Sequence, residues 1–138
     1  MIDVEIIEAK IDIIFTNLSY LAQVKKVDKK EYLDSYEKMQ ATKHSLQESI
    51  EACLDIANHL ISEQGWVRAE TYADMFLRLN EHNIIDSELK DSLSDMARFR
   101  NLLVHRYGAI DDERVWMIIQ ENLDDFELFI KKIEAFIT

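Results

Sequence analysis

The sequence contains no proline and only two glycines, Gly65 and Gly108, among its 138 residues. β-Sandwiches and β-barrels connect many short strands through turns that depend on these two residue types, so the composition disfavours both architectures. Long uninterrupted helices need neither residue in their interior. The scarcity of helix breakers therefore predicts an all-α protein.

Cysteine and long hydrophobic runs are equally scarce. The single cysteine, Cys53, can form no disulfide within the chain, and its neighbours Ala52 and Leu54 suggest a small buried apolar side chain rather than a reactive thiol. No apolar run approaches the roughly 18 residues that span a bilayer. The segment that begins at Met1 is acidic and lacks the basic start of a signal peptide. We therefore expect a cytoplasmic protein with no membrane partner.

Basic residues are outnumbered by acidic ones, 16 to 27, which gives a net charge of −11. Such a balance excludes a protein that coats duplex DNA, because phosphate contacts need lysine and arginine. The arginines are nevertheless clustered, and four of them lie within 17 residues: Arg98, Arg100, Arg106 and Arg114. A local basic site of this kind suits a nucleotide or a short RNA segment.

Apolar residues recur at steps of three and four along most of the chain, which is the period of an amphipathic helix. The pattern predicts five helices, namely about 22 residues from Val4, residues 30–64, a short helix after Thr71, a helix from Asp86 or Ser87 to Gly108, and a last helix from Asp111. A chain of this length can enclose one hydrophobic core. We expect a single domain over residues 1–138, built as an antiparallel up-and-down bundle of about five helices.

Two features suggest that this bundle pairs with a second copy of itself. The helix expected over residues 30–64 would be about 50 Å long, which is more than a domain of this size needs to enclose its own core. On the last expected helix, Trp116, Phe129 and Phe136 lie off the main apolar stripe and add hydrophobic surface. Both observations predict a homodimer.

The segment from Arg100 to Tyr107 groups residue types that act on phosphates. An arginine such as Arg100 binds phosphoryl oxygens through paired hydrogen bonds. Histidine in general has a pKa of about 6.5 and can transfer the protons of RNA cleavage, and His105 is the histidine of this segment. Asn101 precedes His105 by four residues, so it lies on the same helix face and can orient the imidazole. Tyr107 can position a phosphate or accept a covalent modification. This chemistry requires no metal and no cofactor.

Helical geometry separates the two central residues of this segment. At 100° per residue, Arg100 and His105 point about 140° apart, so one regular helix does not aim both at one phosphate. Either the last turn unwinds near Gly108, or a second copy supplies its own His105 across a two-fold axis and forms a composite cleft with two arginines and two histidines. A purely structural role is also open, in which His105 and Tyr107 close the helix end and Arg100 pairs with a carboxylate.

A second polar pattern lies on the helix expected over residues 30–64. Asp55, His59 and Glu63 recur every four residues on one helix face. This spacing suits metal ligands, but solvent-facing helices more often display it as a ladder of charged pairs. We therefore predict no metal site.

The run Arg100-Asn101-Leu102-Leu103-Val104-His105-Arg106-Tyr107 resembles the RX4HXY motif of HEPN-domain proteins, specifically of the HepT toxin family. Residues 46–61 resemble the family's long second helix, and residues 72–76 and 122–126 are also similar to it. The resemblance implies an all-helical, HEPN-like homodimer that acts as a metal-independent endoribonuclease toxin on RNA. It also implies a partner, a minimal nucleotidyltransferase (MNT) antitoxin.

The resemblance gives roles to three residues of the motif. Arg100 and His105 carry over as catalytic residues, and Tyr107 as the residue that the antitoxin modifies with AMP, which blocks the RNA cleft with bulk and negative charge. Arg106 fills a variable position, so no role transfers to it. A different class of function stays open, because HEPN-like bundles also accompany nucleotidyltransferases as non-catalytic nucleotide-binding or assembly subunits. The net charge of −11 favours that alternative over an RNA-binding enzyme.

Overall fold

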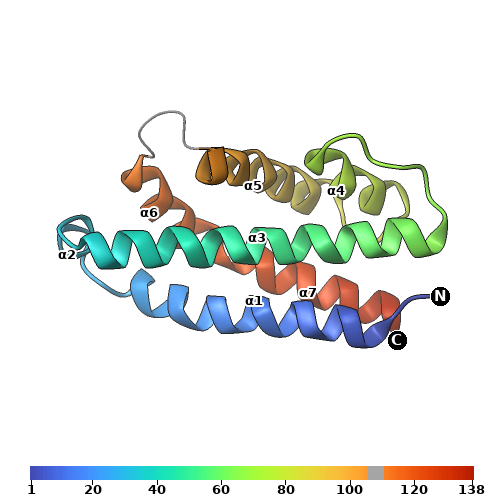
Figure 1. Cartoon of the computed structure of the whole chain (residues 1–138), viewed down its shortest axis with the longest axis horizontal. Helices are drawn as coiled ribbons and strands as arrows, with labels where there is room; N and C mark the ends of the chain where they lie inside the picture. The colour runs from blue at the N-terminus through green and yellow to red at the C-terminus, as the bar shows by residue number, and fades with distance from the viewer. Residues whose placement is uncertain (106–110) are drawn as a thin grey trace.

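The computed structural model describes residues 1–105 and 111–138, and these residues form helices and no β-strand (Figure 1). Along the chain the helices are α1 (Val4–Lys25), α2 (Lys29–Leu33), α3 (Tyr36–Gln64), α4 (Tyr72–Glu81), α5 (Ser87–His105), α6 (Asp112–Glu121) and α7 (Leu123–Ile137). The all-α prediction is confirmed. No helix among the described residues is long and apolar enough to cross a bilayer.

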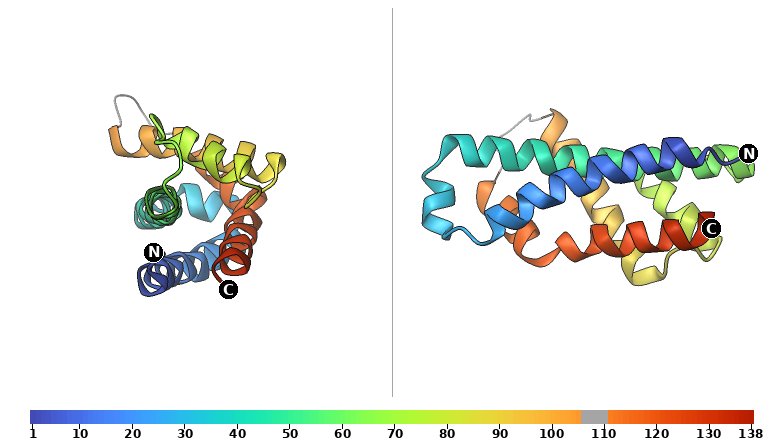
Figure 2. Two further views of the ribbon diagram at one scale, coloured as in Figure 1. Left: turned by 90° about the vertical axis from the view of Figure 1, so that its right-hand side faces the viewer. Right: turned by 90° about the horizontal axis from the view of Figure 1, so that it is seen from below.

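The long helices α1, α3, α5 and α7 alternate in direction, as expected for an up-and-down bundle (Figure 1). Seen from the end, α1 and α7 lie on one side of α3, and the pair of α4 and α5 lies on the other side (Figure 2). The tightest packing joins α1 to α3 and α4 to α5. The segment between Arg100 and His105 is therefore carried on the outer layer, at the end of α5.

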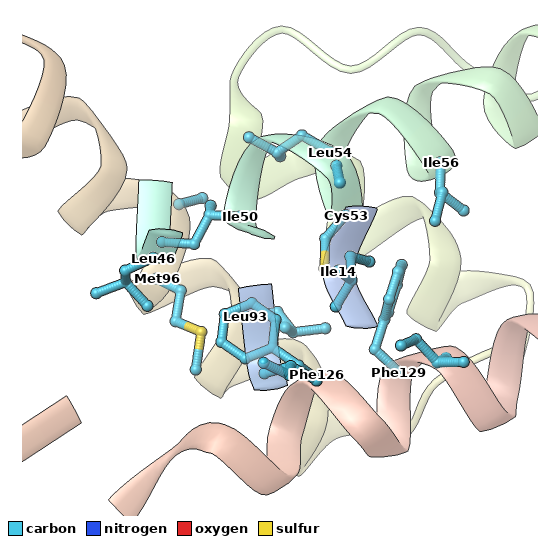
Figure 3. Close-up of a cluster of buried hydrophobic side chains, with 14 of the residues drawn as sticks. Ile14, Leu46, Ile50, Cys53, Leu54, Ile56, Leu93, Met96, Phe126 and Phe129 are labelled. Atoms are coloured by element: carbon cyan, nitrogen blue, oxygen red, sulfur yellow. The ribbon is translucent and has the colours of Figure 1, made fainter. Parts of the chain in front are cut away.

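The hydrophobic core lies where the four long helices meet (Figure 3). Each of them contributes fully buried side chains, for example Ile14 from α1, Ile50 from α3, Leu93 from α5 and Phe126 from α7. Cys53 of α3 is buried among them, and burial raises the pKa of its thiol far above the ordinary value. The thiol is therefore held in its neutral, unreactive form, and the expected packing role of Cys53 is confirmed.

Several helix ends follow from capping residues that the sequence displays. The Thr71 hydroxyl accepts a hydrogen bond of 3.1 Å from the backbone N–H of Asp74 at the start of α4. The Asp111 carboxylate accepts hydrogen bonds from two backbone N–H groups at the start of α6. Gly65 ends α3 in the left-handed conformation with φ of 67°, which a residue with a Cβ adopts at a cost.

The helix expected over residues 30–64 is in fact two helices, α2 and α3. The Ser35 hydroxyl accepts a hydrogen bond of 3.1 Å from the backbone N–H of Lys38 and caps α3, so the chain bends after Asp34. Tyr32 lies before the bend and is fully buried, whereas Tyr36 lies after it and is 72% exposed. The bend therefore turns Tyr36 away from the buried face that Tyr32 occupies, although four residues separate the two, which is the spacing of one helix face.

The last expected helix is also divided, with a break at Asn122 between α6 and α7. The break lets α6 fold over the end of the bundle, where Trp116 packs against Tyr32 with ring centroids 5.1 Å apart. Phe129 of α7 is fully buried and meets Phe76 of α4 edge to face. The prediction that Trp116 and Phe129 add exposed apolar surface is therefore wrong. Phe136 is 38% exposed, so of the three residues only Phe136 still offers apolar surface to a second copy.

Candidate active site

Arg100, Asn101 and His105 lie on the last two turns of α5, which remains helical up to and including His105. The helix therefore does not unwind between Arg100 and His105. The two side chains leave it about 140° apart. Arg100 is largely buried against α3, whereas His105 is exposed. Within one chain the two expected catalytic residues are thus on different sides of α5. Tyr107, the expected AMP acceptor, lies outside the described residues.

The Arg100 guanidinium forms an ion pair with Glu51 of α3. Arg100 Nη2 donates a hydrogen bond of 2.7 Å to Glu51 Oε2, and the two side chains are only 15% and 35% exposed. Gln47, one turn earlier on α3, donates through Nε2 to the other Glu51 oxygen at 3.1 Å. The sequence-based alternative that Arg100 pairs with a carboxylate is therefore correct as to the contact. The hydrogen bond to Glu51 engages one N–H group of the guanidinium.

Two further groups surround the guanidinium. The Cζ atom of Arg100 lies 5.0 Å from the ring centroid of Tyr72, the first residue of α4, in a cation–π contact. The amide oxygen of Asn101 accepts a hydrogen bond of 3.3 Å from Arg100 Nη1. A guanidinium has five N–H donors, and the contacts with Glu51 and Asn101 engage two of them. Donors therefore remain with which Arg100 can bind a phosphate.

A pocket of about 170 Å³ opens beside Arg100 and is lined by Glu51, Leu54, Asp55, Tyr72 and Arg100. Burial acts to raise the pKa of Glu51, but hydrogen bonds from Arg100 and Gln47 and the charge of Arg100 outweigh it and lower the pKa. Glu51 therefore stays ionised at neutral pH and balances the arginine. The pocket has room for a phosphate and part of a sugar rather than for a whole nucleotide.

A larger pocket of about 430 Å³ lies between α4 and α5, away from Arg100 and His105. Its two cations are occupied, since Lys90 pairs with Asp91 at 3.0 Å and Arg98 pairs with Asp95 at 2.8 Å. Neither Arg100 nor His105 lines it. Despite its size, we do not regard this pocket as the active site.

The exposed face of α5 carries His105 together with polar and apolar neighbours. Arg98 lies seven residues before His105, and Asn101 lies four residues before it. Both side chains therefore leave the helix close to the direction of His105. Leu102 and Val104 flank this face and are 52% and 37% exposed. Apolar side chains that are exposed together on one face can form a contact with another protein chain.

Glu51 and Tyr72 are the site residues that the sequence analysis missed. The sequence separates Glu51 from Arg100 by 49 residues and Tyr72 from Arg100 by 28, so no local spacing links either residue to the motif. One signal was present, because Arg100 falls on the apolar stripe of its helix with Leu93 and Leu103. A cation on a buried stripe needs an anionic partner from a neighbouring helix.

The ladder of Asp55, His59 and Glu63 joins α3 to the beginning of the chain. The contacts are an ion pair of 2.9 Å between Lys10 and Asp55, a hydrogen bond of 2.9 Å from the Asp3 backbone N–H to His59 Nε2, and an ion pair of 2.8 Å between the Met1 amino group and Glu63. The described residues contain no group of three or more His, Cys, Asp or Glu side chains that could hold a metal ion. The ladder therefore has a role in packing.

A family model described as "Ribonuclease HepT-like" matches residues 5–133 of the chain. A protein named "tRNA nuclease HepT" from Aphanizomenon flos-aquae is 29% identical over 132 residues, which cover 96% of this chain and 90% of the relative. A protein named "mRNA nuclease HepT" from Shewanella oneidensis is 38% identical over 91 residues, which cover 66% of this chain and 68% of the relative. These matches confirm the expectation of a ribonuclease.

The fold also matches a solved structure of a tri-AMPylated HEPN toxin from Shewanella oneidensis in complex with an MNT antitoxin. The TM-score is 0.87 at 32% sequence identity, and the match covers 94% of this chain and 97% of the toxin. This agreement confirms the expected HEPN-like helical architecture. The chain therefore belongs to the HepT-like ribonuclease family.

Proposed function

We propose that this chain is the toxin of a toxin–antitoxin pair and cuts RNA in a cleft shared by two copies, without a metal. The observation that carries the proposal is the Arg100 guanidinium, which is fixed at the wall of a pocket with unused N–H donors, five residues before His105. The relatives named as tRNA and mRNA nucleases support RNA as the substrate. RNA of this kind is encountered in the cytoplasm, which is where we expect the protein to act.

The chemistry follows from the two side chains and from RNA itself. His105 accepts the proton of the ribose 2′-hydroxyl, the 2′-oxygen attacks the adjacent phosphorus, and the bond to the 5′-oxygen breaks. Arg100 holds the phosphoryl oxygens as negative charge builds on them in the transition state. The proton taken up by His105 returns through solvent to the leaving 5′-oxygen, and the two products end in a 2′,3′-cyclic phosphate and a 5′-hydroxyl. The nucleophile belongs to the substrate, so this route needs neither a metal nor a cofactor.

A second copy of the chain completes this arrangement. Because α5 is helical through His105, one chain directs Arg100 and His105 about 140° apart. A two-fold axis next to the end of α5 brings the His105 of one copy to the Arg100 of the other. The exposed side chains of Leu102 and Val104 at this end of α5 supply apolar surface for the contact.

We further propose that an MNT-type antitoxin silences the enzyme by transferring AMP to Tyr107. The solved structure of a tri-AMPylated HEPN toxin with its MNT antitoxin supports this mode of control. Tyr107 follows His105 by two residues, so each AMP adds a phosphate charge next to the RNA cleft. In this proposal Asn101 has a supporting role through its hydrogen bond with Arg100.

The test uses the purified chain and a single-stranded RNA in the presence of EDTA. We expect cleavage, and we expect Arg100→Ala and His105→Ala each to lower kcat by about 10²–10⁴-fold, the usual effect of removing such groups. Expression of the unmodified chain should arrest growth, whereas the His105→Ala chain should not. Cleavage at the normal rate by both variants would contradict the proposal.

A non-catalytic nucleotide-binding or assembly subunit is the alternative, favoured by the net charge of −11 and by the neutralisation of Arg100 by Glu51. The same preparation distinguishes the two functions, because the alternative predicts tight ATP binding with no RNA cleavage. Mass spectrometry after co-expression with an MNT-type partner tests the regulatory part. Tyr107 should then carry one or more AMP groups, and an unmodified Tyr107 would contradict adenylylation.

A further inference from the structure

We infer that Glu51 of α3 is a positioning residue that holds the Arg100 guanidinium in the orientation needed for catalysis. The inference rests on the proposed ribonuclease function, in which Arg100 binds the scissile phosphate. It concerns a residue 49 positions away in the sequence, on the long central helix that runs beside α5 (Figure 1).

Three contacts from three helices fix the guanidinium. Glu51 of α3 accepts from Nη2 at 2.7 Å, Asn101 of α5 accepts from Nη1 at 3.3 Å, and Tyr72 of α4 lies with its ring centroid 5.0 Å from Cζ. A free arginine side chain samples many rotamers, and fixing it in one of them costs conformational entropy. In this structure the folded protein already holds the Arg100 side chain in place. Substrate binding therefore does not carry the entropy cost of fixing it.

Glu51 is itself held in place, which is what a positioning residue requires. Its Oε1 accepts a hydrogen bond of 3.1 Å from Gln47, and its Oε2 accepts the hydrogen bond from Arg100. Glu51 and Gln47 belong to one unbroken helix of 29 residues, α3. Each carboxylate oxygen therefore has a defined donor, and the plane of the carboxylate is set by the helix.

The negative charge of Glu51 matters because Arg100 lies in a largely buried position. Its side chain is 15% exposed, and its Nε atom is buried with no acceptor among the described residues. A cation in such a place, once deprived of its anion, moves toward solvent because burial without a partner is costly. Loss of Glu51 should therefore release Arg100 from the pocket wall.

The same negative charge repels RNA, and this gives the inference a signature. Removal of Glu51 takes one negative charge away from the cleft, so RNA should bind as well as before or more tightly. Turnover should fall, because Arg100 is no longer aimed at the phosphate. A residue with only a structural role would lower the stability of the protein without this separation of kcat from KM.

The experiment measures kcat and KM of Glu51→Ala and Glu51→Gln on a short single-stranded RNA. We expect Glu51→Ala to lower kcat at least tenfold, with KM unchanged or reduced. Glu51→Gln keeps an oxygen that accepts from Arg100 and should lose less. The matched control is Glu48→Gln, which removes the same charge one turn away on α3, where Glu48 contacts Asn17 and His44. Its kcat should equal that of the wild type.

Wild-type kcat in Glu51→Ala, or a rise in KM at constant kcat, would overturn the inference. If Glu51→Ala does not fold, as judged by its thermal transition, Glu51→Gln decides, and a wild-type kcat in that variant is equally contradictory. These results leave the proposed function intact as long as Arg100→Ala is inactive. An active Arg100→Ala enzyme would instead contradict the proposed function itself.

Discussion

Arg100 owes its place to contacts that no single helix supplies. Glu51 and Tyr72 approach it from α3 and α4, while Asn101 is its neighbour on α5. The motif identified the arginine, because its spacing to His105 is local. Its partners could not be predicted in the same way, because they depend on which faces of α3 and α4 meet α5. Only the position of Arg100 on an apolar stripe hinted that an anion from another helix was required.

Tyr72 provides a prediction at this scale. Tyr72→Leu removes the ring beneath the guanidinium, and we expect kcat on RNA to fall by about two- to fivefold, which is the range of a partly exposed cation–π contact. Tyr72→Phe keeps the ring and should retain kcat. Steady-state cleavage assays on both variants provide the comparison. Equal loss in the two variants would assign the effect to the hydroxyl and would refute the stacking role.

At the scale of the helices, the sequence predicted the type of structure better than its interruptions. Three helix ends lie where the sequence predicts them: Gly65 ends α3, Thr71 precedes α4 and Asp111 precedes α6. Each of these residues is a capping signal next to a change in the apolar period. Ser35 and Asn122 were missed because the apolar period continues in step across both breaks. Periodicity cannot reveal a break that leaves the period unchanged.

The break before α3 can be tested directly. Ser35→Ala removes the hydroxyl that accepts from the Lys38 backbone N–H, and the free energy of unfolding should fall by about 1 kcal/mol. Urea denaturation followed by circular dichroism measures this change. Ser35→Asp preserves a capping oxygen and should remain close to the wild type. Unchanged stability of Ser35→Ala would show that tertiary packing alone sets the bend.

At the scale of the whole molecule, the expected homodimer rests on other residues than those first considered. Trp116 and Phe129 were expected to add surface for a partner, but the break at Asn122 buries both within one chain. The exposed Leu102 and Val104 lie instead on α5, beside His105. Their position connects the proposed dimer contact to the proposed catalytic cleft.

The most direct test of the shared cleft mixes two inactive variants, Arg100→Ala and His105→Ala, under conditions in which subunits exchange. If the Arg100 of one copy acts with the His105 of the other, each mixed dimer contains one intact site. Random exchange makes half of the dimers mixed, so activity on RNA should return to about a quarter of the wild-type value. If both residues act within one chain, no intact site can form. Absence of activity after exchange, verified with two affinity tags, would contradict the account.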